Sequence, residues 1–137
     1  MTVLPGSSLS RAPMRLPLLA ALGVTFWFLA AMTIRFLGPG VFVPGGSLLP
    51  LVFLLTLPVA WAFVWLGLLL SGARGAAVFP AATLMTSVAM LCDGVALTFF
   101  PALYGLTSVP LLLGAAWILW GAGLIQLMAY WWPHSTG

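Results

Sequence analysis

The stretch that decides the fold is LLPLVFLLTLPVAWAFVWLGLLL, residues 48–70, which contains no charged side chain. A helix rises about 1.5 Å per residue, so about 20 apolar residues are enough to cross the hydrocarbon core of a bilayer. The stretch therefore predicts a membrane-spanning helix. Pro50 falls in its first turn, where a missing backbone N–H is harmless, and Pro58 falls in its interior.

Three further apolar segments flank this span: residues 16–37 before it, and residues 77–100 and 109–131 after it. Turns rich in Gly, Pro, Ser and Thr separate the segments, because Pro lacks a backbone donor and Gly favours turns. Short loops place consecutive helices side by side in opposite directions. The predicted fold is all-α, an integral membrane four-helix bundle with antiparallel up-down topology, and residues 1–137 form a single membrane domain.

The composition excludes an ordinary soluble protein. Hydrophobic residues make up 64% of the chain and charged residues 4%, whereas about a quarter of the residues in a soluble domain are charged. The net charge of +3 comes from four arginines spread along the chain, and nucleic-acid phosphates require clustered cations. We therefore expect the lipid bilayer as partner and no nucleic acid. Small residues such as Gly67 and Gly114 are compatible with a homo-oligomer or a larger membrane complex.

The arginines also predict an orientation. Arg11, Arg15 and Arg74 fall on one side of a four-helix topology, and the loops on the other side contain no Lys or Arg. The positive-inside rule then places both termini in the cytoplasm. The first segment is longer than a signal-peptide core, and no small-residue cleavage motif precedes Arg35, so we expect it to be retained.

Asp93 is the only acidic residue, and it lies well inside the third segment. A carboxylate within a bilayer costs a few kcal/mol, so it must be protonated, paired or facing a cavity. From the helical rise, Asp93 lies roughly 7 Å and Arg35 roughly 12 Å beyond the midplane on the outer side. We predict a buried ion pair between Arg35 and Asp93, or a proton or cation site at Asp93. The alternative is that Arg35 reaches the headgroups and leaves Asp93 neutral.

Three threonines lie at a depth comparable to that of Asp93: Thr33, Thr56 and Thr98. They are candidates for the wall of a polar cavity around the carboxyl. The competing interpretation is that each hydroxyl bonds to a carbonyl of its own helix. Deeper on the inner side, Gln126 is expected to bond across helices to one of three hydroxyls, those of Thr83, Thr86 and Ser87.

The sequence contains no catalytic or metal-binding pattern. The single cysteine, Cys92, excludes an intrachain disulfide, and His134 has no cysteine or carboxylate near it in the sequence. Hydrolysis or group transfer needs an activated nucleophile with a base or a metal. We therefore predict no enzyme activity, no metal and no cofactor.

Three short motifs suggest a family: RFLG at residues 35–38, Leu-Pro at 57–58, and Asp93 followed by Phe-Pro at 100–101. With these motifs the chain resembles, over nearly its whole length, the small bacterial four-helix membrane proteins called domain of unknown function 5367. The resemblance implies the bacterial inner membrane and no defined activity. The chain is also similar in size to small multidrug transporters, but their acid lies in the first helix, where this chain has only Arg35.

Two functions follow as hypotheses. The first is an uncharacterised polytopic inner-membrane protein with a structural or accessory role, in which Arg35 and Asp93 make each other tolerable. The alternative is a small-solute or proton-coupled transporter that uses Asp93.

Overall fold

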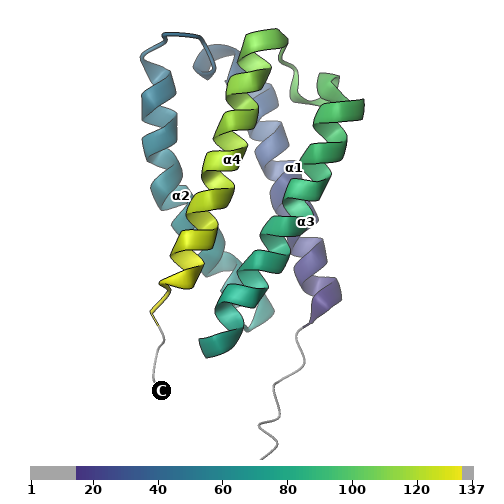
Figure 1. The fold of residues 1–137 in the computed structure, drawn as a ribbon, viewed down its shortest axis with the longest axis vertical. Coiled ribbons are helices and arrows are strands. Elements are labelled where there is room, and N and C mark those ends of the chain that lie inside the picture. Colours follow the sequence, from purple (N-terminus) through teal and green to yellow (C-terminus); the bar gives the residue numbers. More distant parts are fainter. Residues whose placement is uncertain (1–14, 134–137) are drawn as a thin grey trace, which may run out of the picture.

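A computed structural model of the chain describes residues 15–133 (Figure 1). Its four long helices are α1 (Leu16–Val41), α2 (Leu48–Ser71), α3 (Val78–Phe99) and α4 (Ser108–Tyr130). Two 3-10 turns flank α3, namely η1 (Gly75–Ala77) and η2 (Pro101–Tyr104). The described part of the chain contains no strand. The predicted all-α four-helix bundle is confirmed.

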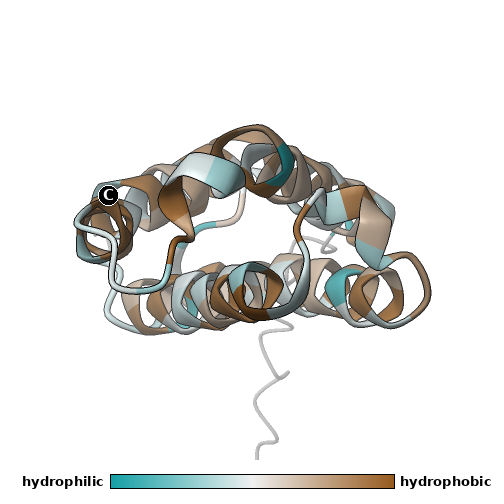
Figure 2. Ribbon diagram, turned by 90° about the horizontal axis from the view of Figure 1, so that it is seen from above, coloured by the Kyte–Doolittle hydropathy of each residue, from teal (hydrophilic) through white to brown (hydrophobic). Residues whose placement is uncertain are grey.

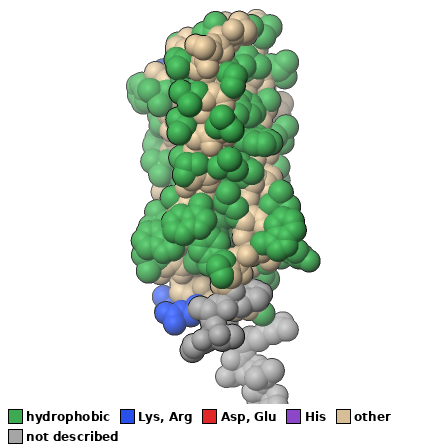
Figure 3. Space-filling model, turned by 90° about the vertical axis from the view of Figure 1, so that its left-hand side faces the viewer, with side chains coloured by type: hydrophobic (Ala, Val, Ile, Leu, Met, Phe, Trp, Pro, Cys, Tyr) green, Lys and Arg blue, Asp and Glu red, His purple; other side chains and the backbone are tan. Residues whose placement is uncertain are grey.

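All four helices are long and apolar enough to cross a membrane. Even α3, with 22 residues, extends about 33 Å at the helical rise, against a hydrocarbon core of about 30 Å. Hydrophobic side chains cover the face seen in Figure 3 over its whole height, with arginines at its lower end. Most of the ribbon of each helix has the brown colour of hydrophobic residues (Figure 2), and large hydrophobic side chains are exposed on all four helices. Such a surface suits lipid rather than water.

Three helices begin and end within one residue of their predicted bounds, but α1 continues to Val41 instead of ending at residue 37. Pro39 removes only the one backbone bond that its own N–H would make. The Phe42 N–H still reaches the Gly38 carbonyl at 2.8 Å, and the buried Phe42 side chain packs on the core. The last turn of α1 is therefore stabilised from outside the helix.

The chain runs alternately up and down, so α1 is parallel to α3 and α2 is parallel to α4 (Figure 1). These two parallel pairs make the most extensive contacts, although consecutive helices also touch. At Gly23 of α1, a Cβ atom would lie 2.6 Å from the Met85 carbonyl oxygen and 2.9 Å from Val88 Cβ of α3. The absence of a side chain at Gly23 thus lets the two helices approach closely, which loop length alone does not predict.

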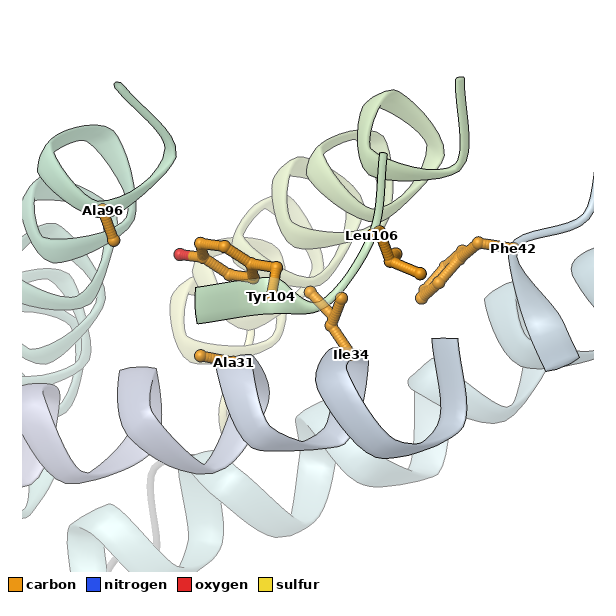
Figure 4. Close-up of a cluster of buried hydrophobic side chains, with 6 residues drawn as sticks. All are labelled: Ala31, Ile34, Phe42, Ala96, Tyr104 and Leu106. Carbon is orange, nitrogen blue, oxygen red and sulfur yellow. The ribbon is translucent and has the colours of Figure 1, made fainter. Parts of the chain in front are cut away.

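The buried side chains form clusters at both ends of the bundle. At the end that carries η2, called the η2 end, the cluster joins α1, α3 and the segment after it (Figure 4). Its members are Ala31, Ile34, Phe42, Ala96, Tyr104 and Leu106. At the opposite end, called the terminal end because α1 begins and α4 ends there, Leu19, Val64, Leu68 and Val78 are buried. The level between the clusters contains a cavity.

Candidate functional site: a cavity beside Asp93

Asp93 lies in the half of α3 nearer to η2 and is held there by a tyrosine from η2. The carboxyl is 6% exposed, and its Oδ1 accepts a 2.5 Å hydrogen bond from the Tyr104 hydroxyl. The same hydroxyl accepts a 3.3 Å bond from Trp27 Nε1 of α1. Tyr104 is 0% exposed, and its ring runs from η2 towards α3 (Figure 4). The three residues thus connect α1, η2 and α3 inside the bundle.

Arg35 does not pair with Asp93, and the predicted ion pair is absent from residues 15–133. Its Nη1 instead donates to the carbonyl oxygens of Ala102 and Leu103, at 3.0 Å each. Both carbonyls belong to the short η2 turn, where the Ala102 oxygen also accepts from the Gly105 N–H at 3.1 Å, so Arg35 adds a second donor to that oxygen. A guanidinium on these carbonyls keeps its charge near the end of the bundle, where water and headgroups reach it.

Arg35 and Asp93 nevertheless both form hydrogen bonds with the η2 turn. Arg35 fixes the carbonyls of the two residues before Tyr104, while Asp93 fixes the Tyr104 hydroxyl. Gly105 permits this arrangement, since its φ of +67° favours glycine and a Cβ there would lie 3.2 Å from Arg35 Cγ. The link between the two charged residues is therefore indirect and passes through the η2 turn.

A cavity of about 110 Å³ lies beside Asp93 and is partly open to the surface. All four helices contribute to its wall, for example with Trp27 from α1, Thr56 from α2, Thr86 and Asp93 from α3, and Trp117 from α4. The remaining lining side chains are apolar or aromatic. A carboxyl group in such a wall can bind a proton or a cation, because low-dielectric surroundings strengthen its interactions.

Of the three threonines predicted to line this cavity, only Thr56 does. Thr33 and Thr98 are exposed and bond to the Leu29 and Gly94 carbonyls of their own helices, at 2.8 and 2.7 Å. The prediction compared the depth of the residues along the helices but not the direction in which each side chain points, which rotates by about 100° per residue around a helix. For Thr33 and Thr98 it is wrong, and the competing interpretation describes both residues correctly.

Thr56 itself is part of a bond chain between α2 and α4. Its hydroxyl donates to the Val52 carbonyl at 2.6 Å and accepts from Trp117 Nε1 at 2.7 Å. One turn further along α4, Trp120 Nε1 donates to the Phe53 carbonyl at 3.0 Å. These indole contacts hold α4 against α2 and leave Thr56 fixed in the cavity wall.

Sequence reasoning missed Tyr104 as a member of the site. It considered Thr86 as a partner of Gln126 and on a pathway from Asp93, but not as part of a cavity wall. Thr86 precedes Asp93 by seven residues, which is two helical turns and therefore the same face of α3. That spacing was a usable signal. Tyr104 follows the end of α3 and turns back into the bundle through η2, and no periodic pattern predicts such a return. The predicted bond of Gln126 is confirmed, since Thr83 Oγ1 donates to Gln126 Oε1 at 3.0 Å.

Other candidate residues do not join this site. Cys92 is a free, half-buried thiol. Within residues 15–133, no group of three or more His, Cys, Asp or Glu side chains is placed to hold a metal. Arg11 and His134 lie outside the described residues.

No family model, no curated protein and no solved structure matches this chain. The resemblance to domain of unknown function 5367 thus stays a prediction, and any inference about function depends on the site itself.

Proposed function

We propose that the protein binds a small solute within the bilayer and transports it, with Asp93 as the group that binds the solute and exchanges protons. One observation carries the proposal: the only acidic residue of the chain lines a cavity to which all four helices contribute. An ionisable side chain in a membrane helix is costly, and it commonly marks a solute or proton pathway when it faces a cavity.

The packing of the bundle supports the view that the cavity has a function and is not a packing defect. Membrane helices associate by close packing, and α1 and α3 do so at Gly23. At the level of the cavity, however, large side chains such as Phe26, Phe63 and Trp117 surround free space. Phe26 and Phe63 meet edge to face, with ring centroids 4.7 Å apart, so these two rings pack against each other in the wall.

The charges support a specific orientation in the membrane. Arg15 and Arg74 lie at the terminal end of the bundle, which the positive-inside rule assigns to the cytoplasm. On this proposal the protein lies in a bacterial inner membrane with both termini inside, and Asp93 lies in the outer half of the bilayer. The η2 turn then closes the bundle towards the outside.

The test is infrared difference spectroscopy of the purified protein in lipid, because Asp93 is the only carboxyl side chain of the chain. Three single-ring solutes of different charge serve as probes: benzylamine, benzyl alcohol and benzoate. We expect at least one to shift or remove the Asp93 carboxyl band, and Asp93→Asn to lack that change. Solute counterflow in proteoliposomes then tests transport. A folded protein whose carboxyl band responds to none of the three contradicts the proposal.

A structural or accessory role is the second candidate, and one observation favours it. Every buried side-chain nitrogen or oxygen among the described residues has a hydrogen-bond partner, as expected if the polar groups serve only to hold the bundle together. On this alternative, replacement of Asp93 lowers stability and changes no solute response. The infrared experiment therefore separates the two functions.

A further inference from the structure

The cavity lies at the middle height of the bundle, where the bilayer is most apolar. Its lining residues surround the midpoints of the helices, as Trp27 does in α1, Ala60 in α2, Ala89 in α3 and Ile118 in α4. Two positions on its wall also face outward, because Val59 is 44% and Met90 is 40% exposed. An opening at this depth leads to lipid chains and not to water. A ligand that uses it must dissolve in hydrocarbon.

The wall lacks a positive charge to balance the carboxyl. Of the described residues that line the cavity, none is Lys, Arg or His. Arg35 is engaged by the two η2 carbonyls, and the ionisable groups nearest to Asp93 are Tyr104, which donates to it, and Cys92, next to it in α3. One carboxyl oxygen of Asp93 accepts from Tyr104, and Asp93 is part of the cavity wall. A positive charge beside Asp93 therefore has to come from a bound species and not from a described side chain of the wall.

Four aromatic side chains stand among the aliphatic ones in the apolar part of the wall. Phe26 and Trp27 of α1, Phe63 of α2 and Trp117 of α4 border the cavity. Aromatic rings attract cations at their faces, and the attraction grows when water is excluded. An engineered cavity of about 150 Å³ in another protein holds benzene. This cavity is smaller, at about 110 Å³, but it is partly open, so a single ring with a short substituent would extend into the opening.

We infer that the ligand of this cavity is a hydrophobic single-ring amine that arrives through the lipid and places its nitrogen on Asp93. This inference rests on the proposed function and names its solute class. The neutral amine meets the protonated carboxyl, the carboxyl O–H bond breaks, and the proton forms a new N–H bond on the amine. The product is an ammonium–carboxylate pair, so no net charge enters the membrane. Tyr104 continues to donate to the carboxylate.

The test is ligand binding by fluorine NMR in lipid nanodiscs, with empty nanodiscs to correct for partition into lipid. The probes are 4-fluorobenzylamine and 4-fluorobenzyl alcohol, which differ only in the polar group. We expect the amine to bind about tenfold more tightly or better, since a charge-assisted bond replaces a neutral one. Asp93→Asn retains an oxygen for Tyr104 and should reduce this ratio to near one while the alcohol still binds.

Two glycines of α4 provide a matched pair of variants that tests where the probes bind. Gly121 lines the cavity, and a Cβ there would lie 3.6 Å from Thr56 Cγ2. Gly123 is exposed and a Cβ there would meet nothing within 4 Å. Gly121→Leu should fill the cavity and abolish binding of both probes, whereas Gly123→Leu should leave both affinities unchanged.

The possible results are distinct. Equal affinity for the amine and the alcohol in the unaltered protein, or an amine preference that survives in Asp93→Asn, overturns the inference about solute class but leaves solute binding in place. The comparison of the two probes on the unaltered protein decides this even if Asp93→Asn does not fold. Absence of binding by both probes to the folded protein overturns the inference, and it overturns the proposed function as well if benzoate leaves the Asp93 carboxyl band unchanged. Binding that Gly121→Leu does not affect overturns both, because it lies outside the cavity.

Discussion

Replacement of Tyr104 by Phe removes a single hydroxyl that satisfies two buried groups. It leaves Asp93 Oδ1 without its donor at 2.5 Å and Trp27 Nε1 without its acceptor at 3.3 Å. A buried polar group left unsatisfied costs about 1–3 kcal/mol, although side-chain hydrogen bonds between membrane helices average about 0.6 kcal/mol. Tyr104 is 0% exposed, so water cannot replace the hydroxyl without rearrangement. We expect Tyr104→Phe to lower the free energy of unfolding by about 1–3 kcal/mol.

The assay is reversible unfolding in mixed micelles with increasing SDS, followed by far-UV circular dichroism. Tyr130→Phe is the matched control, since Tyr130 is 63% exposed and its change should stay within about 0.5 kcal/mol. A double-mutant cycle with Asp93→Leu should give a coupling energy of about 1 kcal/mol or more, as expected for residues in one network. Additive effects, or a loss for Tyr104→Phe no larger than for Tyr130→Phe, would refute the Tyr104–Asp93 contact.

Three further predictions concern the packing around the site. Gly23→Ala should destabilise the bundle by about 1–3 kcal/mol through a clash with α3. In the same unfolding assay Gly94→Ala, whose Cβ would meet nothing within 4 Å, should be neutral or stabilising. Equal effects of the two changes would contradict the close approach of α1 and α3. Arg35→Met should increase amide hydrogen exchange in η2 and leave the centres of the helices protected, whereas unchanged exchange would mean that its two carbonyl bonds do not hold the turn. Gln126→Leu and Thr83→Ala should each cost less than about 1.7 kcal/mol, the upper end for such bonds in membranes, and their effects should be less than additive if the two side chains bond to each other.

Much of the fold can be predicted from the lengths of the apolar segments and from the Gly- and Pro-rich turns that separate them. The run at residues 48–70 and the segments around it predict four helices because lipid requires each backbone polar group to be satisfied within a helix. The same reasoning failed at the end of α1, where Phe42 packs on the η2 end and extends the helix past Pro39. It also gave no reason for the close contact between α1 and α3, which depends on a missing side chain at Gly23.

The candidate site was only partly predictable, for a related reason. The position of Asp93 within a span is a property of the sequence, and so is its cost in hydrocarbon. The partner of Asp93 is not a property that the sequence shows. Depth and opposite charge suggested Arg35, but the carbonyls of the turn that follows α3 bind its guanidinium instead. Tyr104 reaches the carboxyl through a fold-back that has no periodic signature. Backbone groups and irregular turns therefore decided the contacts that side-chain patterns left open.

The central claim, that Asp93 binds the nitrogen of a solute inside the bundle, can be measured directly by solid-state NMR. Asp93 is the only Asp or Glu of the chain, so protein labelled with [4-13C]aspartate has one side-chain carboxyl signal of interest. With 15N-labelled 4-fluorobenzylamine in the bilayer, we expect carbon–nitrogen dipolar dephasing that corresponds to about 4 Å, the distance of a close ion pair, and its loss in Gly121→Leu but not in Gly123→Leu. A labelled amine that binds the protein with no dephasing of the Asp93 carboxyl would contradict the account.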